Sequence, residues 1–175
     1  MSAWRFDPNG FNGSVIDEFR ANGGVVGGEL ADMPLLLLTT IDTSGKPRTT
    51  PLAYHTRGDR YLVIASNDGA TRNPTWFRNL ERDPAVTVEV GVETFAATAT
   101  ILQASERDAA FATIVTEAPS AGTLQARASR TIPVIELDAR EEPKAAEELG
   151  GHGHRTQLDQ PSVAGGRMRR DVPLP

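Results

Sequence analysis

The chain has 175 residues, 39% of them hydrophobic and 23% charged, which is enough for one ordinary domain with a buried core. Its net charge of -5 argues against a protein whose main partner is nucleic acid, because such domains carry a strong basic excess. It contains no cysteine, which excludes disulfides and thiolate metal sites. No signal-peptide pattern and no apolar run of roughly 20 residues is present, so we expect a cytoplasmic protein without a transmembrane segment.

The first third of the chain is expected to contain a helix and a buried strand. Apolar side chains recur at helical spacing through residues 11–22, and Gly23-Gly24 follows where a helix C-terminal cap belongs. The apolar run 35–41 has the length of a buried strand.

The middle and late parts of the chain alternate between strand-like and helix-like patterns. Ser105 with Asp108 resembles a capping box, and it predicts the start of a late helix. The expected elements are strands over 51–56 and 61–65, a helix from Asn73-Pro74 to Asp83-Pro84, strands over 85–90 and 94–102, helices from Ser105 and over 120–128, and a last strand over 132–137.

These elements indicate a mainly β protein with flanking helices and about six antiparallel strands, largely joined by hairpins. A closed or nearly closed barrel would remove the exposed edges of such a sheet. The periodicity by itself leaves both a barrel and an open sheet possible.

Residues 1–140 are expected to form this domain, and residues 141–175 a flexible C-terminal tail. The tail has few large apolar side chains, so it buries too little apolar area to offset its ordering entropy. Deleting 141–175 should therefore leave the melting temperature of the domain nearly unchanged, which thermal unfolding of the two chain lengths can measure. A drop of many degrees would show that the tail is part of the fold.

Three segments have residue types suited to binding a ligand. In the turn at 45–51, Lys46 and Arg48 precede two threonines, a pattern typical of phosphate binding but also of a solvated basic turn. The strand end at 64–69 leaves N–H groups and a hydroxyl that could hold a heterocycle edge, or it is a plain Asx turn. In the helix at 73–80, Trp76 could lie against a flat ring or fill the core.

Histidines do not form an expected metal site. His55 lies in a strand with no second ligand at metal spacing, and His152 and His154 lie in the expected tail. Since three or four converging ligands are the norm, we expect no metal.

Taken together, these segments resemble the deazaflavin-dependent nitroreductase family. The resemblance extends from about Phe11 to Leu137. The matching pieces are FRANGG at 19–24, PLLLLTT at 34–40, GKPRTTPL at 45–52, DRYLVIASNDG at 59–69, NPTWFRNL at 73–80, DPAVTVEVG at 83–91 and SRTIPVIEL at 129–137.

The resemblance implies a split β-barrel similar to that of FMN-binding oxidoreductases. It also implies coenzyme F-420, an 8-hydroxy-5-deazaflavin with a phospholactate and polyglutamate tail. The implied activity is hydride transfer from reduced F-420 to a small organic acceptor, such as a quinone, a nitro compound or an activated alkene. Two alternatives stay open: an FMN-dependent split-barrel oxidoreductase and a non-catalytic deazaflavin carrier.

The resemblance also implies a set of site residues, with the cofactor's phosphate near Lys46 and Arg48. Ser66 or water is the candidate proton donor. The implied cofactor-binding residues are Thr43, Ser44, Lys46, Pro47, Arg48, Thr49, Thr50, Pro51, Leu52, Ala53, Ile64, Ala65, Ser66, Asn67, Thr75, Trp76 and Asn79, and the implied substrate pocket is Ala118, Ala121 and Leu124.

The chain departs from the family pattern in two places. Family members often have Gly-Arg-Lys/Arg-Ser/Thr-Gly where this chain has residues 41–45, with Asp42 in place of a cation. We therefore expect weaker binding of the anionic tail. Members that reduce nitroimidazoles have tyrosines in the segment matching Ala118 to Leu124, so their absence predicts a different or wider acceptor pocket. We expect a small-molecule acceptor, no nucleic acid, and a monomer or homodimer.

Overall fold

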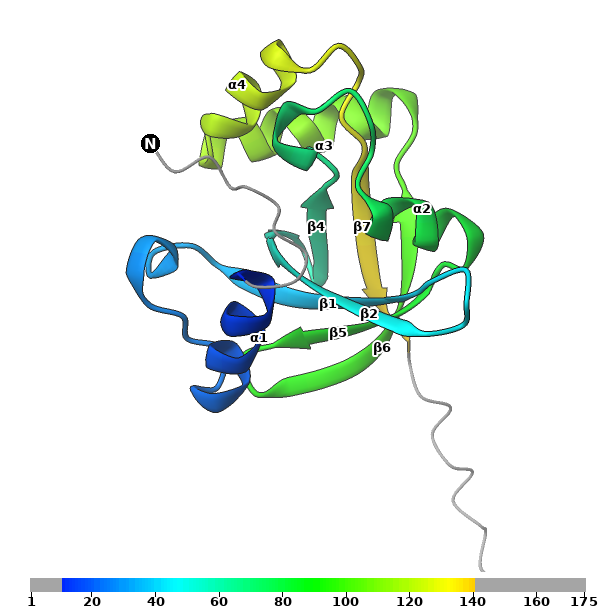
Figure 1. Ribbon diagram of the computed structural model, residues 1–175. Coiled ribbons are helices and arrows are strands. Elements are labelled where there is room, and N and C mark those ends of the chain that lie inside the picture. Colours follow the sequence, from blue (N-terminus) through cyan, green and yellow to red (C-terminus); the bar gives the residue numbers. More distant parts are fainter. Residues whose placement is uncertain (1–10, 141–175) are drawn as a thin grey trace, which may run out of the picture. The chain divides into compact units, whose positions relative to one another are not determined.

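The computed structural model describes residues 11–140. Its helices and strands follow one another along the chain as Figure 1 shows. They are α1 (Phe11–Ala21), the short 3-10 helix η1 (Gly28–Leu30), β1 (Leu35–Ile41), β2 (Pro47–Ala53), β3 (His55–Arg57), β4 (Arg60–Ile64), the short 3-10 helix η2 (Asn67–Gly69), α2 (Thr75–Arg82), β5 (Ala85–Val90), β6 (Glu93–Ile101), α3 (Ala104–Glu117), α4 (Ser120–Arg127) and β7 (Val134–Ala139).

The seven strands form one antiparallel sheet in the order β2-β1-β5-β6-β7-β4-β3. Its two edge strands, β2 and β3, are consecutive in the chain and are separated only by Tyr54. The sheet must therefore curl until its edges approach each other. The long strand β6 makes the bend, because it pairs with β5 through residues 93–98 and with β7 through 97–101. As a result β1 and β2 run across the direction of β4 and β7 (Figure 1).

Buried apolar residues gather in three clusters, one inside the curled sheet and two outside it. Because side chains alternate across a strand, β1 directs Leu36 and Leu38 into the central cluster and Leu35 and Leu37 toward α1. This burial on both faces explains the continuous apolar run of β1. Residues of α2 belong to the central cluster.

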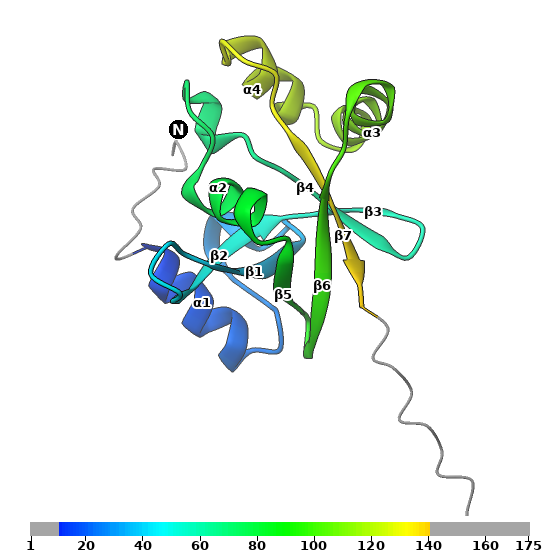
Figure 2. The same ribbon diagram turned by 90° about the vertical axis from the view of Figure 1, so that its right-hand side faces the viewer.

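The remaining helices cover the outside of the sheet at two places. α3 and α4 pack over β4 and β7, where Ile114 and Ala121 join Leu62 and Val134 in what we call the α3–α4 cluster. They lie together at one end of the sheet, whereas α1 lies at the other (Figure 1). Figure 2 shows α2 on a different side of the sheet from α1.

The predicted fold class is confirmed, and β1 has the bounds that the sequence predicted. Two local predictions are wrong. The expected strand 51–56 is divided at Tyr54, whose N–H donates to Pro34 O at 3.1 Å, and its two parts lie on opposite edges. The expected capping box is also absent, because Ser105 lies inside α3 and the residue at its N-cap is Gln103.

The expected tail over 141–175 lies outside the described residues. None of the helices within residues 11–140 combines the length and the apolar character needed to cross a bilayer.

Candidate functional site

The turn between β1 and β2 is organised around the Asp42 carboxylate. Its Oδ1 accepts hydrogen bonds from the Ser44 hydroxyl at 2.6 Å, the Ser44 N–H at 2.8 Å and the Lys46 N–H at 3.0 Å. Its Oδ2 accepts one from Arg48 Nε at 2.7 Å. The Ser44 hydroxyl and then the Arg48 guanidinium hold the pKa of Asp42 well below its usual range. The carboxylate therefore stays ionised and already satisfies several donors of the predicted phosphate turn.

Two cationic side chains of this turn still face solvent. Lys46 is exposed, and the Arg48 side chain is 61% exposed. The bond from Arg48 to Asp42 uses one of the five N–H donors of the guanidinium. The turn can therefore bind a phosphate through Lys46 and the other donors of Arg48, in competition with Asp42.

Strand β2 divides the predicted ring-binding residues between two faces. Arg48, Thr50 and Leu52 share the face of the central cluster, because they lie opposite the β1 residues of that face. Thr49 and Pro51 lie on the face covered by α1, where the Thr49 and Thr39 hydroxyls are 2.7 Å apart. A ligand bound on one face of β2 can therefore contact the side chains of only one of these two sets.

The backbone of β2 offers a further donor, because β2 is an edge strand. Pro47 and Pro51 have no N–H, so their positions suit the outward side of an edge strand. Thr49 lies two residues from each of these prolines, so it has the same orientation in the strand and its N–H points away from β1. This geometry leaves a main-chain donor at the strand edge.

The connection from β4 to α2 carries the second predicted segment. Ser66 and Asn67 are half-buried, and Asn67 Nδ2 donates to Arg72 O at 2.9 Å. Asn67 and Asp68 have positive φ values of 46° and 53°. The segment is thus a tight polar turn at the end of a strand, as the sequence suggested.

Two side chains from a distant part of the chain contact this connection, Arg130 at most points and Arg127 at Asp68 O, 3.1 Å away. The Arg130 guanidinium donates to the carbonyl oxygens of Ala65 and Ser66 at 3.0 Å each and to the Asn73 side chain. It also donates to Ala70 O at 3.0 Å and Arg72 O at 3.3 Å. The sequence gives Arg130 no predicted role, because its hydrogen-bond partners lie 57 to 65 positions earlier in the chain.

The third segment, α2, is mostly buried. Trp76 belongs to the central cluster and is 4% exposed, which supports the core-filling alternative for this side chain. Asn79 is also 4% exposed, and its Nδ2 donates to the Thr40 hydroxyl at 3.1 Å. Thr75 at the start of α2 is exposed. Of these three predicted residues, only Thr75 presents its side chain to solvent.

The predicted cofactor residues thus fall into an accessible group and a buried group. Ile64 packs on the α3–α4 cluster, whereas its neighbour Ala65 belongs to the central cluster. The exposed or half-buried ones are Thr43, Ser44, Lys46, Pro47, Arg48, Thr49, Thr50, Leu52, Ala53, Ile64, Ser66, Asn67 and Thr75, and the buried ones are Pro51, Ala65, Trp76 and Asn79.

The three segments nevertheless meet in space. Leu52, Ala65 and Trp76 all belong to or pack against the central cluster. Arg82, at the end of α2, donates to Ile41 O at 3.0 Å and so ties α2 to the β1–β2 turn. α2 therefore runs from the β4 connection to that turn.

We call the accessible residues along this path the cofactor surface. It is cationic at one end and carries hydroxyl and amide groups at the other, so its donor set fits a flat heterocycle with an anionic tail. The cofactor surface comprises Lys46, Arg48, Thr50, Leu52, Ser66, Asn67 and Thr75.

The predicted acceptor segment lies where α3 meets α4. Ala121 is 3% exposed and packs in the α3–α4 cluster, so its side chain faces the core rather than a pocket. Ala118 and Leu124 are half-buried and are the accessible ones among the three predicted pocket residues. Nearby, His55 Nδ1 lies 2.8 Å from a Glu117 oxygen. Within residues 11–140, no three His, Asp or Glu side chains cluster as a metal site.

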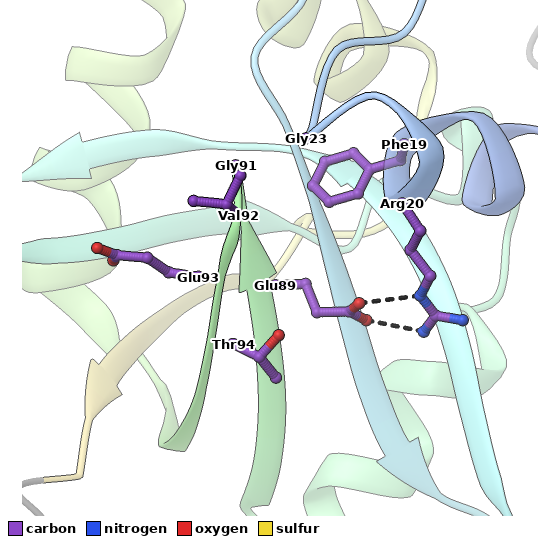
Figure 3. A pocket seen from close by; sticks show the side chains of 8 residues that line it. All are labelled: Phe19, Arg20, Gly23, Glu89, Gly91, Val92, Glu93 and Thr94. Carbon is purple, nitrogen blue, oxygen red and sulfur yellow. Dashed lines mark hydrogen bonds and ion pairs between the residues drawn. The ribbon is translucent and has the colours of Figure 1, made fainter.

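A surface hollow elsewhere in the molecule contains none of the predicted residues. It surrounds the joint between α1 and the β5–β6 hairpin, where Arg20 donates to Glu89 at 2.9 and 2.8 Å (Figure 3). We regard it as a structural joint because its Arg20 guanidinium already pairs with Glu89.

Comparison with known proteins adds independent findings. Residues 14–138 match the family described as F420H(2)-dependent quinone reductase. An F420H(2)-dependent quinone reductase of Mycobacterium tuberculosis is 37% identical over 127 residues, which cover 70% of this chain and 85% of that protein.

Solved structures show a similar fold. One, described as an F420-H2 dependent reductase, is 31% identical with a TM-score of 0.57, and the match covers 64% of this chain and all of that one. Another, described as a domain-swapped dimer, is 30% identical with a TM-score of 0.58, and the match covers 72% of this chain and 93% of that one.

Proposed function

The chain belongs to the F420H(2)-dependent quinone reductase family, and on that premise we propose that it transfers hydride from reduced F-420 to a quinone at the cofactor surface. One observation supports this location most: segments from β2, the β4 connection and α2 pack on a single cluster. Each segment was a weak signal in the sequence, and their convergence gives them a common use.

The residues of the cofactor surface have distinct proposed roles. Lys46 and Arg48 would hold the phosphate by charge-assisted hydrogen bonds. Thr50, Leu52 and the connection at 66–67 would flank the ring. Hydride transfer depends chiefly on close approach and orientation, which a ring seated against fixed strands and a helix would have.

The redox change itself is simple. When bound, reduced F-420 supplies a hydride, which together with one proton converts a quinone to a hydroquinone. We propose the half-buried Ser66 hydroxyl, or a water molecule, as the source of that proton. Among possible acceptors, the family description favours a quinone over a nitro compound or an activated alkene. No observation favours the FMN-dependent enzyme or the carrier.

Binding measurements test this proposal. Fluorescence titration of F-420, FMN and FAD against the purified protein should show far tighter binding of F-420. Tighter binding of FMN would contradict it. Lys46→Ala should weaken F-420 binding by about 1–3 kcal/mol, and added salt should weaken binding to the native protein.

Arg48→Ala should weaken F-420 binding more than Lys46→Ala does. It removes a donor and also leaves the Asp42 carboxylate without its cationic partner. Arg140→Ala is the matched control, since Arg140 is bonded to Thr98 on β6, outside the cofactor surface. Native affinity in both turn variants at low salt would place the phosphate elsewhere.

The proposal also includes a cytoplasmic location, a small-molecule acceptor without nucleic acid, and a monomer or homodimer. The net charge of -5 supports the absence of nucleic acid. The dimeric relative at 30% identity favours the homodimer, and sedimentation can measure the oligomeric state directly.

A further inference from the structure

We propose that Arg130 is a positioning residue for the cofactor surface, acting through the β4–α2 connection at 65–74. Its guanidinium gathers acceptors along nearly the whole connection, from Ala65 at its start to Asn73 near its end. This inference rests on the proposed function, because positioning matters only if the connection contacts a cofactor.

The connection has little structure of its own. Its backbone bonds to itself are local, from Gly69 N–H to Ser66 O at 2.9 Å and from Ala70 N–H to Asn67 O at 3.0 Å. Two consecutive non-glycine residues, Asn67 and Asp68, lie in the left-handed region. Such positions cost energy and persist only when the surroundings fix them.

Arg130 fixes the residues on both sides of this pair, Ser66 and Ala70, while Arg127 of α4 donates to Asp68 O at 3.1 Å. Arg130 donates to four carbonyl oxygens of the connection, those of Ala65, Ser66, Ala70 and Arg72. Without it the partly buried Ala65 O and Ser66 O would each lose a hydrogen bond. Because Ser66 O and Asn73 bind the same guanidinium, the end of β4 and the start of α2 keep a fixed spacing. That spacing sets where Ser66, Asn67 and Thr75 stand relative to one another.

The backbone of Arg130 is itself fixed by α4. Gln125 Nε2 donates to Arg130 O at 2.8 Å, and Gln125 Oε1 accepts from Ile132 N–H at 2.9 Å and from Arg107 Nη2 at 2.8 Å. The backbone of residues 130–132 is therefore held by two hydrogen bonds to Gln125 of α4, the helix that carries Ala121 and Leu124. Arg130 thus connects the 65–74 connection with α4.

The geometry requires arginine rather than lysine. A guanidinium presents five donors in a rigid plane, whereas an ammonium is a compact point charge with three. Burial lowers the pKa of Arg130, which agrees with a guanidinium enclosed by carbonyl groups. Arg130→Lys should therefore keep the charge and lose the simultaneous contacts.

The test compares Arg130→Lys with Arg20→Lys. Arg20 is a matched control because its guanidinium also makes two hydrogen bonds, to Glu89 at 2.9 and 2.8 Å, away from the connection and from the residues that hold Arg130. Four quantities are measured in each variant: the Kd for F-420, the KM for reduced F-420, the KM for menadione, and the hydrogen exchange of the 65–73 peptide without cofactor. Thermal unfolding reports general damage.

Arg130→Lys is expected to weaken F-420 binding and raise the KM for reduced F-420 by about tenfold or more, with little change in the KM for menadione. Exchange in 65–73 should become faster. Arg20→Lys should lose its two bonds to Glu89 without these changes. Equal losses of affinity in both variants, or native affinity in Arg130→Lys, would overturn the proposal.

If Arg130→Lys does not fold, Asn73→Ala removes one acceptor and should cause a smaller loss of the same kind. Native affinity for F-420 in a folded Asn73→Ala protein with unchanged 65–73 exchange would then overturn the proposal. Wild-type protein that fails to bind F-420 would overturn the proposed function, and this inference with it. If the wild-type protein binds F-420 and the variants bind it equally well, only the role of Arg130 would be overturned.

Discussion

Replacing Gly24 with alanine is expected to lower the free energy of unfolding by about 2–5 kcal/mol, combining left-handed strain with overpacking. Gly24 has φ of +91°, and a Cβ added there would lie 2.5 Å from the Gly91 Cα. The obstacle is the backbone of the β5–β6 turn, which cannot rotate away as a side chain can. Urea unfolding of the variant and the native protein measures the difference.

Gly28→Ala is the matched control for this prediction. Gly28 also has a positive φ, +66°, but a Cβ there would meet nothing within 4 Å. Gly28→Ala should therefore lower the free energy of unfolding only by the left-handed strain, about 1–2 kcal/mol. Equal losses in the two variants would mean that the loop after α1 does not press on the β5–β6 turn.

This contact bears on the candidate site through α1. The loop after α1 touches the β5–β6 turn, and Arg20 of α1 pairs with Glu89 of β5. α1 covers the outer face of β1 and β2, where Thr49 and Pro51 lie. A displaced α1 would thus expose the face of β2 opposite the cofactor surface, so Gly24→Ala should affect stability more than cofactor affinity.

Local patterns were sufficient to predict most of the elements. The bounds of β1 and the position of α1 were predicted because continuous burial and helical spacing are properties of short segments. The break at Tyr54 was not predictable in this way, since the residues on both sides suit a strand. It exists because the sheet curls and its two edges meet at that residue, which is a property of all seven strands together.

The candidate site also combines contacts between near neighbours in the sequence with contacts between distant residues. The Asp42 turn depends on partners two to six residues away, so the sequence could have indicated it as an Asx turn. The bond from Asn79 to Thr40 joins residues 39 positions apart, and those of Arg130 span more. No local signal distinguishes these residues from ordinary polar ones, and only the folded arrangement identifies their partners.

The largest difference in activity is expected between two classes of acceptor, with measurable reduction of menadione and little or none of bicyclic nitroimidazoles. Of the three predicted pocket residues, Ala118 and Leu124 are accessible, and neither side chain offers a hydroxyl to orient a nitro group. A flat apolar quinone binds by area and stacking, and needs no such donor. A nitroimidazole without oriented hydrogen bonds loses the geometry on which hydride transfer depends.

The measurement is the oxidation of reduced F-420, followed by absorbance, with each acceptor at equal concentration. Ala118→Tyr and Ala118→Phe form a matched pair that differs only in the hydroxyl, and Ala118 is suitable because it is half-buried whereas Ala121 is in the core. The tyrosine variant should gain more nitroimidazole turnover than the phenylalanine variant, since only its hydroxyl can orient a nitro group. Faster native turnover with a nitroimidazole than with every quinone tested would refute this account of the acceptor segment while leaving the choice of cofactor intact.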